Sequence, residues 1–116
     1  MESILETVKK ANNLAKEYEA FDSDLIVYTN TALAVLNQLG VGDGVFFSVT
    51  GYDETWDMIE TDAVPMEMLK TYVGLKVRML FDPPSGSVAE AYKNSIAELE
   101  WRLQVDGDKT GRKETD

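Results

Sequence analysis

A double proline divides the C-terminal part of the chain and constrains its fold more than any other feature. Residues 65–81 carry apolar side chains at spacings of three and four, which predicts a helix that neighbouring elements bury on several sides. This helix is expected to begin at Pro65, because the missing N–H of proline has no partner at a first helical position. It is expected to end at Asp82, since Pro83 and Pro84 remove two backbone donors and push the preceding residue out of the α region.

A second helix is expected directly after this stop. Ser87 and Glu90 have the spacing of a capping box, in which each side chain accepts a hydrogen bond from a free backbone N–H. Apolar side chains at helical spacing follow through residues 88–103, so the second helix can fold back on the first as a hairpin. Trp101 lies off this apolar stripe. It either packs under another element or is available to a partner, because tryptophan is enriched at protein interfaces.

Three details of this hairpin lead to expectations of their own. Glu98 and Arg102 are four residues apart and can pair on the helix surface. Arg78 lies on a mostly apolar helix and needs an acid nearby, because a buried unpaired charge is costly. Asp82 is the first candidate for that acid, and an acid of the last helix is the second. Gly74 in mid-helix is either tolerated strain or a site where another backbone approaches closely.

The N-terminal part of the chain predicts two more helices. Residues 3–18 form an amphipathic pattern with a possible capping box at its start. Asn12 and Asn13 are a weak point at which this helix can end. Residues 22–39 predict the next helix, which ends at Gly40, a residue suited to the left-handed position after a helix.

Polar residues of the helix at 22–39 have expected roles. Asp22 or Ser23 is expected to cap its start, because a side-chain oxygen can accept from the free N–H groups there. Asn30 sits among apolar residues and is expected to face solvent. A buried hydrogen bond from Asn30 to another helix is the alternative interpretation.

The segment after this helix contains a strand-like run. Residues 45–49 are rich in β-forming side chains and are flanked by glycines, which predicts a short strand or β-hairpin near 45–52. Such a strand must find a partner or lie against helices. Residues 53–59 predict a short helix with Asp53 as its cap and Trp56 among its anchors.

Together these elements predict an all-α fold, a small bundle of about four helices with a C-terminal helical hairpin and one short strand or β-hairpin. The 116 residues fit one domain, expected at residues 1–105. Residues 106–116 are polar and are expected to form a disordered tail. No apolar run approaches the length of a membrane span, and the start lacks the positive flank of a signal peptide, so we expect a soluble protein that is intracellular when made.

Composition argues against most catalytic chemistry. The chain contains no cysteine and no histidine, which removes disulfides, thiolate metal sites and the usual general base. Acid pairs are interpreted as caps and a solvated face, because glycosidase-type hydrolysis needs two carboxylates facing across a cleft. These pairs are Asp22/Asp24, Asp53/Glu54/Asp57 and Glu98/Glu100. We therefore expect a protein that is not an enzyme and needs no cofactor or metal.

The net charge of −10, from 21 acidic and 11 basic residues, limits the choice of partner. Binding to a phosphate backbone needs clustered Lys and Arg, and the sequence has no such cluster. The charge favours a basic partner surface instead. One functional hypothesis is therefore an acidic helical regulator or decoy that binds a basic protein.

Several motifs in combination resemble a known family. They are Phe-Asp-Ser-Asp-Leu-Ile at 21–26, Leu-Asn-Gln-Leu-Gly-Val-Gly at 36–42, Thr-Trp at 55–56, the run at 72–85 that contains Leu-Lys-Val-Arg-Met-Leu-Phe-Asp-Pro-Pro, and Glu-Leu-Glu-Trp-Arg-Leu at 98–103. The chain is similar, from about residue 3 to 104, to the small head–tail connector (adaptor) proteins of tailed phages and prophages of Gram-positive bacteria.

This resemblance implies a mainly helical subunit that forms a ring of twelve copies beneath the portal and extends the DNA channel. The implied partners are the portal protein, other copies of the chain and the next neck or tail-completion protein, with double-stranded DNA passing through without specific binding. The implied location is the head–tail junction of the virion, and the host cytoplasm before assembly. Candidate contact residues for the portal or a neighbouring copy are Phe46, Trp56, Arg78, Asp82, Glu98, Trp101 and Arg102.

Overall fold

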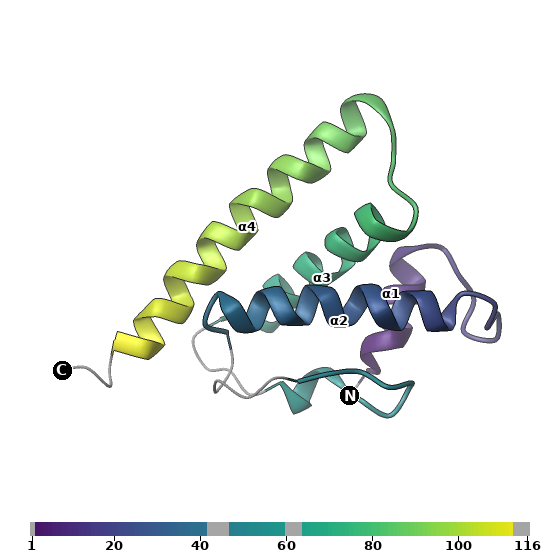
Figure 1. The fold of residues 1–116 in the computed structure, drawn as a ribbon, viewed down its shortest axis with the longest axis horizontal. Coiled ribbons are helices and arrows are strands. Elements are labelled where there is room, and N and C mark those ends of the chain that lie inside the picture. Colours follow the sequence, from purple (N-terminus) through teal and green to yellow (C-terminus); the bar gives the residue numbers. More distant parts are fainter. Residues whose placement is uncertain (1, 42–46, 60–63, 113–116) are drawn as a thin grey trace.

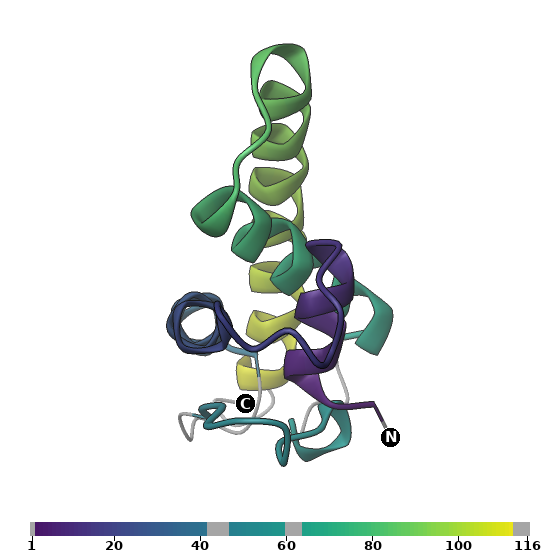
Figure 2. The ribbon, with the colours of Figure 1, turned by 90° about the vertical axis from the view of Figure 1, so that its right-hand side faces the viewer.

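A computed structural model describes residues 2–41, 47–59 and 64–112, with the backbone alone for 107–112. Its helices are α1 (Ile4–Ala11), α2 (Asp22–Gln38), the 3-10 turn η1 (Trp56–Met58), α3 (Met66–Phe81) and α4 (Gly86–Arg112). Figure 1 shows α2 crossing in front of α3, with α4 running diagonally beside them. The molecule is flat, with extents of 49 × 35 × 19 Å, and Figure 2 shows α2 nearly end-on beside the long α4. The predicted all-α class is confirmed.

The first helix is shorter than the sequence pattern predicts. The Ser3 hydroxyl accepts a hydrogen bond from the Glu6 backbone N–H at 3.4 Å, as expected of a capping residue. The helix ends at Ala11, and Asn13 has a φ of +59°, a left-handed conformation that asparagine tolerates. Residues 12–18, which continue the amphipathic pattern, therefore lie outside the helix. The helix ends at the predicted weak point before Asn12 and Asn13.

The second helix begins one residue earlier than a cap at Asp22 would require. Phe21 occupies the N-cap position and makes no side-chain capping bond, so the expected cap at Asp22 or Ser23 is wrong. The C-terminal end agrees with the prediction. Gly40 has a φ of +91°, and the Val41 N–H donates to the Leu36 carbonyl at 3.0 Å, which closes the end of the helix.

The strand predicted near 45–52 is absent from its described part, residues 47–52. Residues 45 and 46, and with them the candidate contact residue Phe46, lie outside the described residues. The Asn30 side chain takes the place of a strand partner: its Nδ2 donates to the Val49 carbonyl at 3.0 Å, and its Oδ1 accepts from the Val49 N–H at 2.7 Å. Asn30 is therefore neither simply solvent-facing nor bonded to another helix, and both interpretations were wrong.

The C-terminal hairpin has the expected stop at its centre. Pro65 is the N-cap of α3 and not its first helical residue, so the helix begins at Met66, one residue later than predicted. It ends at Phe81, directly before the Asp-Pro-Pro run. Helix α4 begins at Gly86, one residue before Ser87, so Ser87 lies inside the first turn and not at the predicted cap. The helical backbone of α4 continues to Arg112, through part of the region expected to be a tail.

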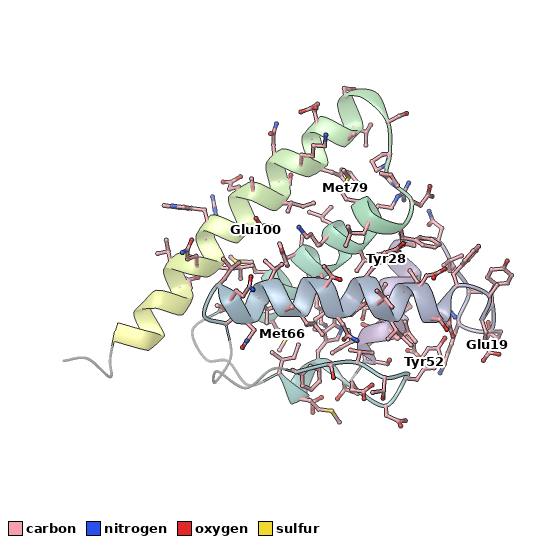
Figure 3. All side chains as sticks on the ribbon, in the orientation of Figure 1. Glu19, Tyr28, Tyr52, Met66, Met79 and Glu100 are labelled. Atoms are coloured by element: carbon pink, nitrogen blue, oxygen red, sulfur yellow. The ribbon has the colours of Figure 1, made fainter. Side chains whose placement is uncertain are left out.

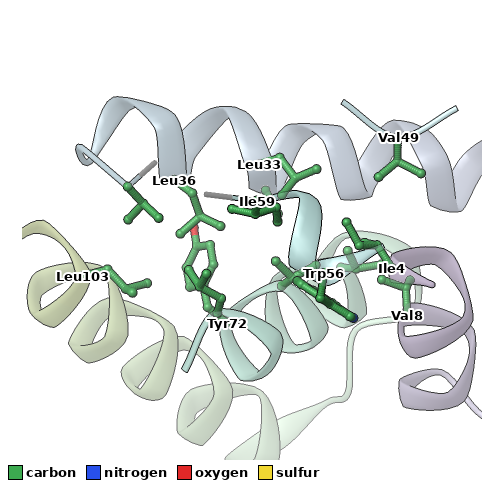
Figure 4. Packing of buried hydrophobic residues seen from close by; sticks show 14 of the residues in the cluster. Ile4, Val8, Leu33, Leu36, Val49, Trp56, Ile59, Tyr72 and Leu103 are labelled. Atoms are coloured by element: carbon green, nitrogen blue, oxygen red, sulfur yellow. The ribbon is translucent and has the colours of Figure 1, made fainter. Parts of the chain in front are cut away.

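All of these helices contribute to one core. Figure 4 shows side chains of α1, α2, η1 and α3 meeting around Trp56 and Tyr72, with Leu103 of α4 at one side. Within the described part of α4, Ile96 and Leu103 are the large apolar side chains that are buried. Since α4 has 27 residues, most of its surface lies outside the core of the protein.

Candidate interaction surface

A buried lysine joins four segments at one end of the molecule. Lys9 of α1 is 1 % exposed, and its Nζ lies 2.7 Å from the Asp22 carboxylate and 2.7 Å from the Tyr52 hydroxyl. The same Nζ donates to the backbone carbonyls of Lys16 and Tyr18, at 2.8 and 2.7 Å. Burial lowers the pKa of Lys9, but the hydrogen bonds and charges of Asp22 and Tyr52 raise it by more, so the net pKa lies above its ordinary value.

Sequence reasoning missed this contact, although one signal was present. Lys9 lies four residues after Leu5, on the same side of α1 as the apolar stripe. The lysine fixes the turn at 16–18 against the start of α2 and against the segment that carries Tyr52. The turn that carries Tyr18 is therefore held in place by a buried side chain.

Tyr18 of this turn belongs to an aromatic patch, which we define as Tyr18, Phe21, Tyr28 and Phe81. The Phe21 ring packs edge-on against Tyr18 and Phe81, with centroid distances of 5.8 and 5.2 Å, and Tyr28 lies 6.5 Å from Phe81. Tyr18 is 50 % exposed and Phe21 is 38 % exposed. Such exposed aromatic rings are typical of contact surfaces.

Three exposed acids lie within three residues of Tyr18 or Phe21 in the sequence. They are Glu17, Glu19 and Asp24, and none of them forms an ion pair within the described residues. Figure 3 shows Glu19 at the outer edge of the molecule, in the turn that leads into α2. This end of the subunit is therefore both aromatic and acidic.

The outer side of α4 carries a further exposed aromatic side chain, away from the patch. Trp101 is 65 % exposed, more than any other large apolar residue in the described ranges. Beside it, the Arg102 guanidinium pairs with the Glu98 carboxylate at 2.7 Å, which confirms the expected pair at i,i+4. All three residues were candidates from the sequence, and the structure brings them together on one exposed stretch of helix.

The remaining candidates have other positions. Trp56 is fully buried, and its Nε1 donates to the Thr7 hydroxyl at 2.8 Å, so its side chain belongs to the core. The Arg78 Nε donates to the backbone carbonyl of Asp82 at 2.6 Å. Neither expected carboxylate partner of Arg78 was correct, because the guanidinium instead satisfies a carbonyl at the end of α3.

An open groove of about 290 Å³ lies between α3 and α4 near their connection. Met79, Leu80 and Ile96 line it with apolar side chains, and Lys76, Lys93 and Glu100 line it with charged ones. At this groove the Tyr72 hydroxyl donates to Glu100 at 2.7 Å, and Lys76 lies 3.6 Å from the same carboxylate. These contacts attach α4 to α3.

Comparison with protein families identifies the family of the chain. The family model described as phage connector protein matches residues 4–110, from the first residue of α1 into the last turns of α4. The chain belongs to the phage connector protein family. Comparison with curated proteins gives no match, and neither does comparison with solved structures.

Family membership sets the general role of this connector protein. It has a structural role at the head–tail junction of a phage particle and interacts with other phage head or tail proteins. The family is structural and not enzymatic. In the described parts of this connector protein, no three metal-ligating side chains come together and no helix is long and apolar enough to cross a bilayer.

Proposed function

We propose that this connector protein is a subunit of a ring beneath the portal, which joins head to tail and extends the DNA channel. The observation that carries the proposal is the family match, because it covers every helix of the subunit from α1 into α4. We propose twelve copies in the ring, one for each subunit of a dodecameric portal. The side of the ring away from the portal would contact the next neck or tail-completion protein.

The arrangement of α4 supports a role in docking. A helix of 27 residues is about 40 Å long, yet the core retains only its inner face. The exposed remainder of α4 is a long surface that another protein can cover. We therefore place the portal contact on α4 and on the residues that follow it.

The negative charge supports a channel through which DNA slides. The proposal places acids of the 53–62 stretch or of the last helix at the lumen, where they would repel the phosphate backbone. Asp53 and Asp57 are exposed on the side of the subunit that carries η1, and residues 60–63 lie outside the described residues. Finding these acids on the outer side of an assembled ring would contradict this part of the proposal.

The direct test mixes the purified protein with the portal ring encoded beside it and measures the mass of the complex. One copy per portal subunit is the expected result. A chain that stays unbound at saturating portal, at every salt concentration, would overturn the proposal. A salt-sensitive complex with a basic nucleic-acid-binding protein would then favour the acidic regulator.

A truncated chain tests the docking surface. Deleting the residues after Gln104 removes the end of α4 together with the tail. We expect weaker binding to the portal. Unchanged binding would show that these residues do not contribute to docking, and it would leave the exposed part of α4 before Gln104 as the candidate.

A further inference from the structure

Two exposed aromatic surfaces lie at opposite ends of the subunit. The aromatic patch lies at the start of α2, around Phe21. Figure 4 shows Leu103, two residues after Trp101, on the side of the core that holds Leu36 near the other end of α2. From Phe21 to Leu36 the helix spans about 22 Å, at 1.5 Å per residue.

The Trp101 side chain points away from its own subunit. At 100° per residue, Trp101 is rotated by about 140° around α4 from Ile96, which faces the core. This rotation agrees with the exposed fraction of 65 % for Trp101 and 8 % for Ile96. A partner that covers Trp101 must therefore approach from outside the subunit.

The charges beside the two surfaces differ. Arg102, next to Trp101, is 54 % exposed and pairs with Glu98 within the helix. The acids Glu17, Glu19 and Asp24 lie within three residues of Tyr18 or Phe21 in the sequence, and they form no ion pair in the part of the chain that the structure describes. Because an exposed ion pair contributes little, Arg102 can exchange Glu98 for one of these acids while the exposed aromatic side chains of the two surfaces pack together.

We infer that Trp101 of one copy packs on the aromatic patch of the next copy, with Arg102 facing its acids. This inference rests on the proposed ring and identifies the contact that builds it. The two surfaces are different and lie at opposite ends of the molecule, so the contact is heterologous. Repeated from copy to copy, a heterologous contact closes into a ring when its rotation allows.

Because the natural chain contains no cysteine, crosslinking between introduced cysteines can test this contact. Glu19→Cys lies beside the aromatic patch, and Gln104→Cys lies about one turn from Trp101, both at exposed positions. The two single variants are mixed on the portal ring and treated with a short thiol-specific crosslinker. We expect dimers that contain one copy of each variant, and a double variant should give a ladder of higher oligomers.

Matched controls use another exposed position of the same helix. Val88 is 50 % exposed and lies 13 residues before Trp101 on the same helix. Val88→Cys should therefore not crosslink with Glu19→Cys. Trp101→Ala should lower the crosslink yield about tenfold, as for an interface hot spot, whereas Val88→Ala should leave it unchanged. Circular dichroism of each variant verifies that the helices remain folded.

The outcomes separate this inference from the proposed function. A complex with one copy per portal subunit but no crosslink between positions 19 and 104 would overturn the inference alone. Equal crosslinking from position 88 would overturn the inference too. If Trp101→Ala loses portal binding and no crosslink forms between positions 19 and 104, Trp101 contacts the portal and the inference is wrong. Failure of the unmodified chain to bind the portal would remove the proposed function and the inference together.

Discussion

Lys9 shows how a single residue can connect elements that are distant in the sequence. A lysine ammonium that leaves water must recover its hydrogen bonds from protein oxygens. Lys9 has four such oxygens, from Asp22, Tyr52 and two backbone carbonyls of the turn at 16–18. The hydrogen bonds hold α1, α2 and the segment around Tyr52 in one arrangement.

Replacing Lys9 by methionine tests this contribution. Lys9→Met should lower the free energy of unfolding by about 3 kcal/mol, because it leaves Asp22 and Tyr52 without their partner in a partly buried site. Urea denaturation followed by circular dichroism measures the change. Lys10→Met is the matched control: Lys10 is 77 % exposed in its side chain, and its pair with Glu2 should contribute less than about 1 kcal/mol. Equal effects of the two variants would contradict the assigned role.

Tyr72 and Lys9 predict that stability declines at alkaline pH. Burial and the hydrogen bond to Glu100 raise the pKa of Tyr72, and the net pKa of Lys9 is also raised. Both groups therefore hold their protons more tightly in the folded state. Their contribution to stability is complete below the pKa values of the unfolded chain, near 10, and is lost as the pH rises above them.

Urea denaturation at about pH 9, 10 and 11 measures this decline, which can reach about 1.4 kcal/mol per pH unit for each group. Tyr72→Phe should show a smaller decline, because phenylalanine has no proton to lose. It should also be less stable at neutral pH by about 1.5 kcal/mol, through loss of the bond to Glu100. The same pH dependence in the variant and the natural chain would exclude Tyr72 as a cause.

At the scale of elements, local sequence signals set most helix boundaries, whereas hydrogen bonds from residues distant in the sequence hold the irregular segment 47–55. Asn30 bonds both backbone groups of Val49, as a neighbouring strand would. In addition, the Ile4 N–H donates to the Glu54 carbonyl at 3.0 Å, and an isolated bridge joins Ser3 to Thr55. The segment 47–55 is thereby attached to α1 and α2 without forming a sheet.

Gly74 gives a prediction for α3. A Cβ added there would lie 3.6 Å from the Ala11 Cβ, an ordinary van der Waals distance, so no backbone approaches too closely for a methyl group. Gly74→Ala should therefore raise the free energy of unfolding by up to about 1 kcal/mol, the difference in helix propensity. This outcome corresponds to tolerated strain, the first of the two interpretations of the sequence.

Gly86→Ala is the matched control, since a φ of +64° disfavours any residue with a Cβ even where space is open. It should lower the free energy of unfolding by about 1 kcal/mol. Thermal or urea denaturation distinguishes the two variants. A Gly74→Ala chain that is less stable than the natural one would show that the contact with Ala11 is tighter than the structure indicates.

At the scale of the whole molecule, a flat subunit with different chemistry at its two ends suits lateral assembly. The extents of 49 × 35 × 19 Å provide a broad face and a thin edge. The aromatic patch includes Phe21 at the start of α2, whereas Leu103, two residues after Trp101, lies on the side of the core that holds Leu36 near the other end of α2. The net charge of −10 is expected to repel a phosphate backbone.

The free subunit is expected not to bind double-stranded DNA. Nonspecific affinity comes from Lys and Arg that displace counterions from phosphates, and acids outnumber these residues by 21 to 11. At about 10 μM protein and low salt, a gel-shift or anisotropy measurement should show no binding. Replacing Glu17, Glu19 and Asp24 together by lysine changes the net charge by +6. This variant should show weak, salt-sensitive binding to DNA. Binding by the natural chain would contradict a channel that DNA passes freely.

By itself the sequence determined the helical class, the family resemblance and most helix ends. Pro65, the stop before Pro83 and Pro84, and Gly40 act through steric and hydrogen-bond effects within a few residues, which can be derived from local order alone. The tertiary structure decided which side chains are buried or exposed. Trp56 and Trp101 are the same residue type, yet one is fully buried and the other is 65 % exposed. Their environments, like the partners of Lys9 and Asn30, depend on which distant elements meet, and local spacing does not encode those contacts.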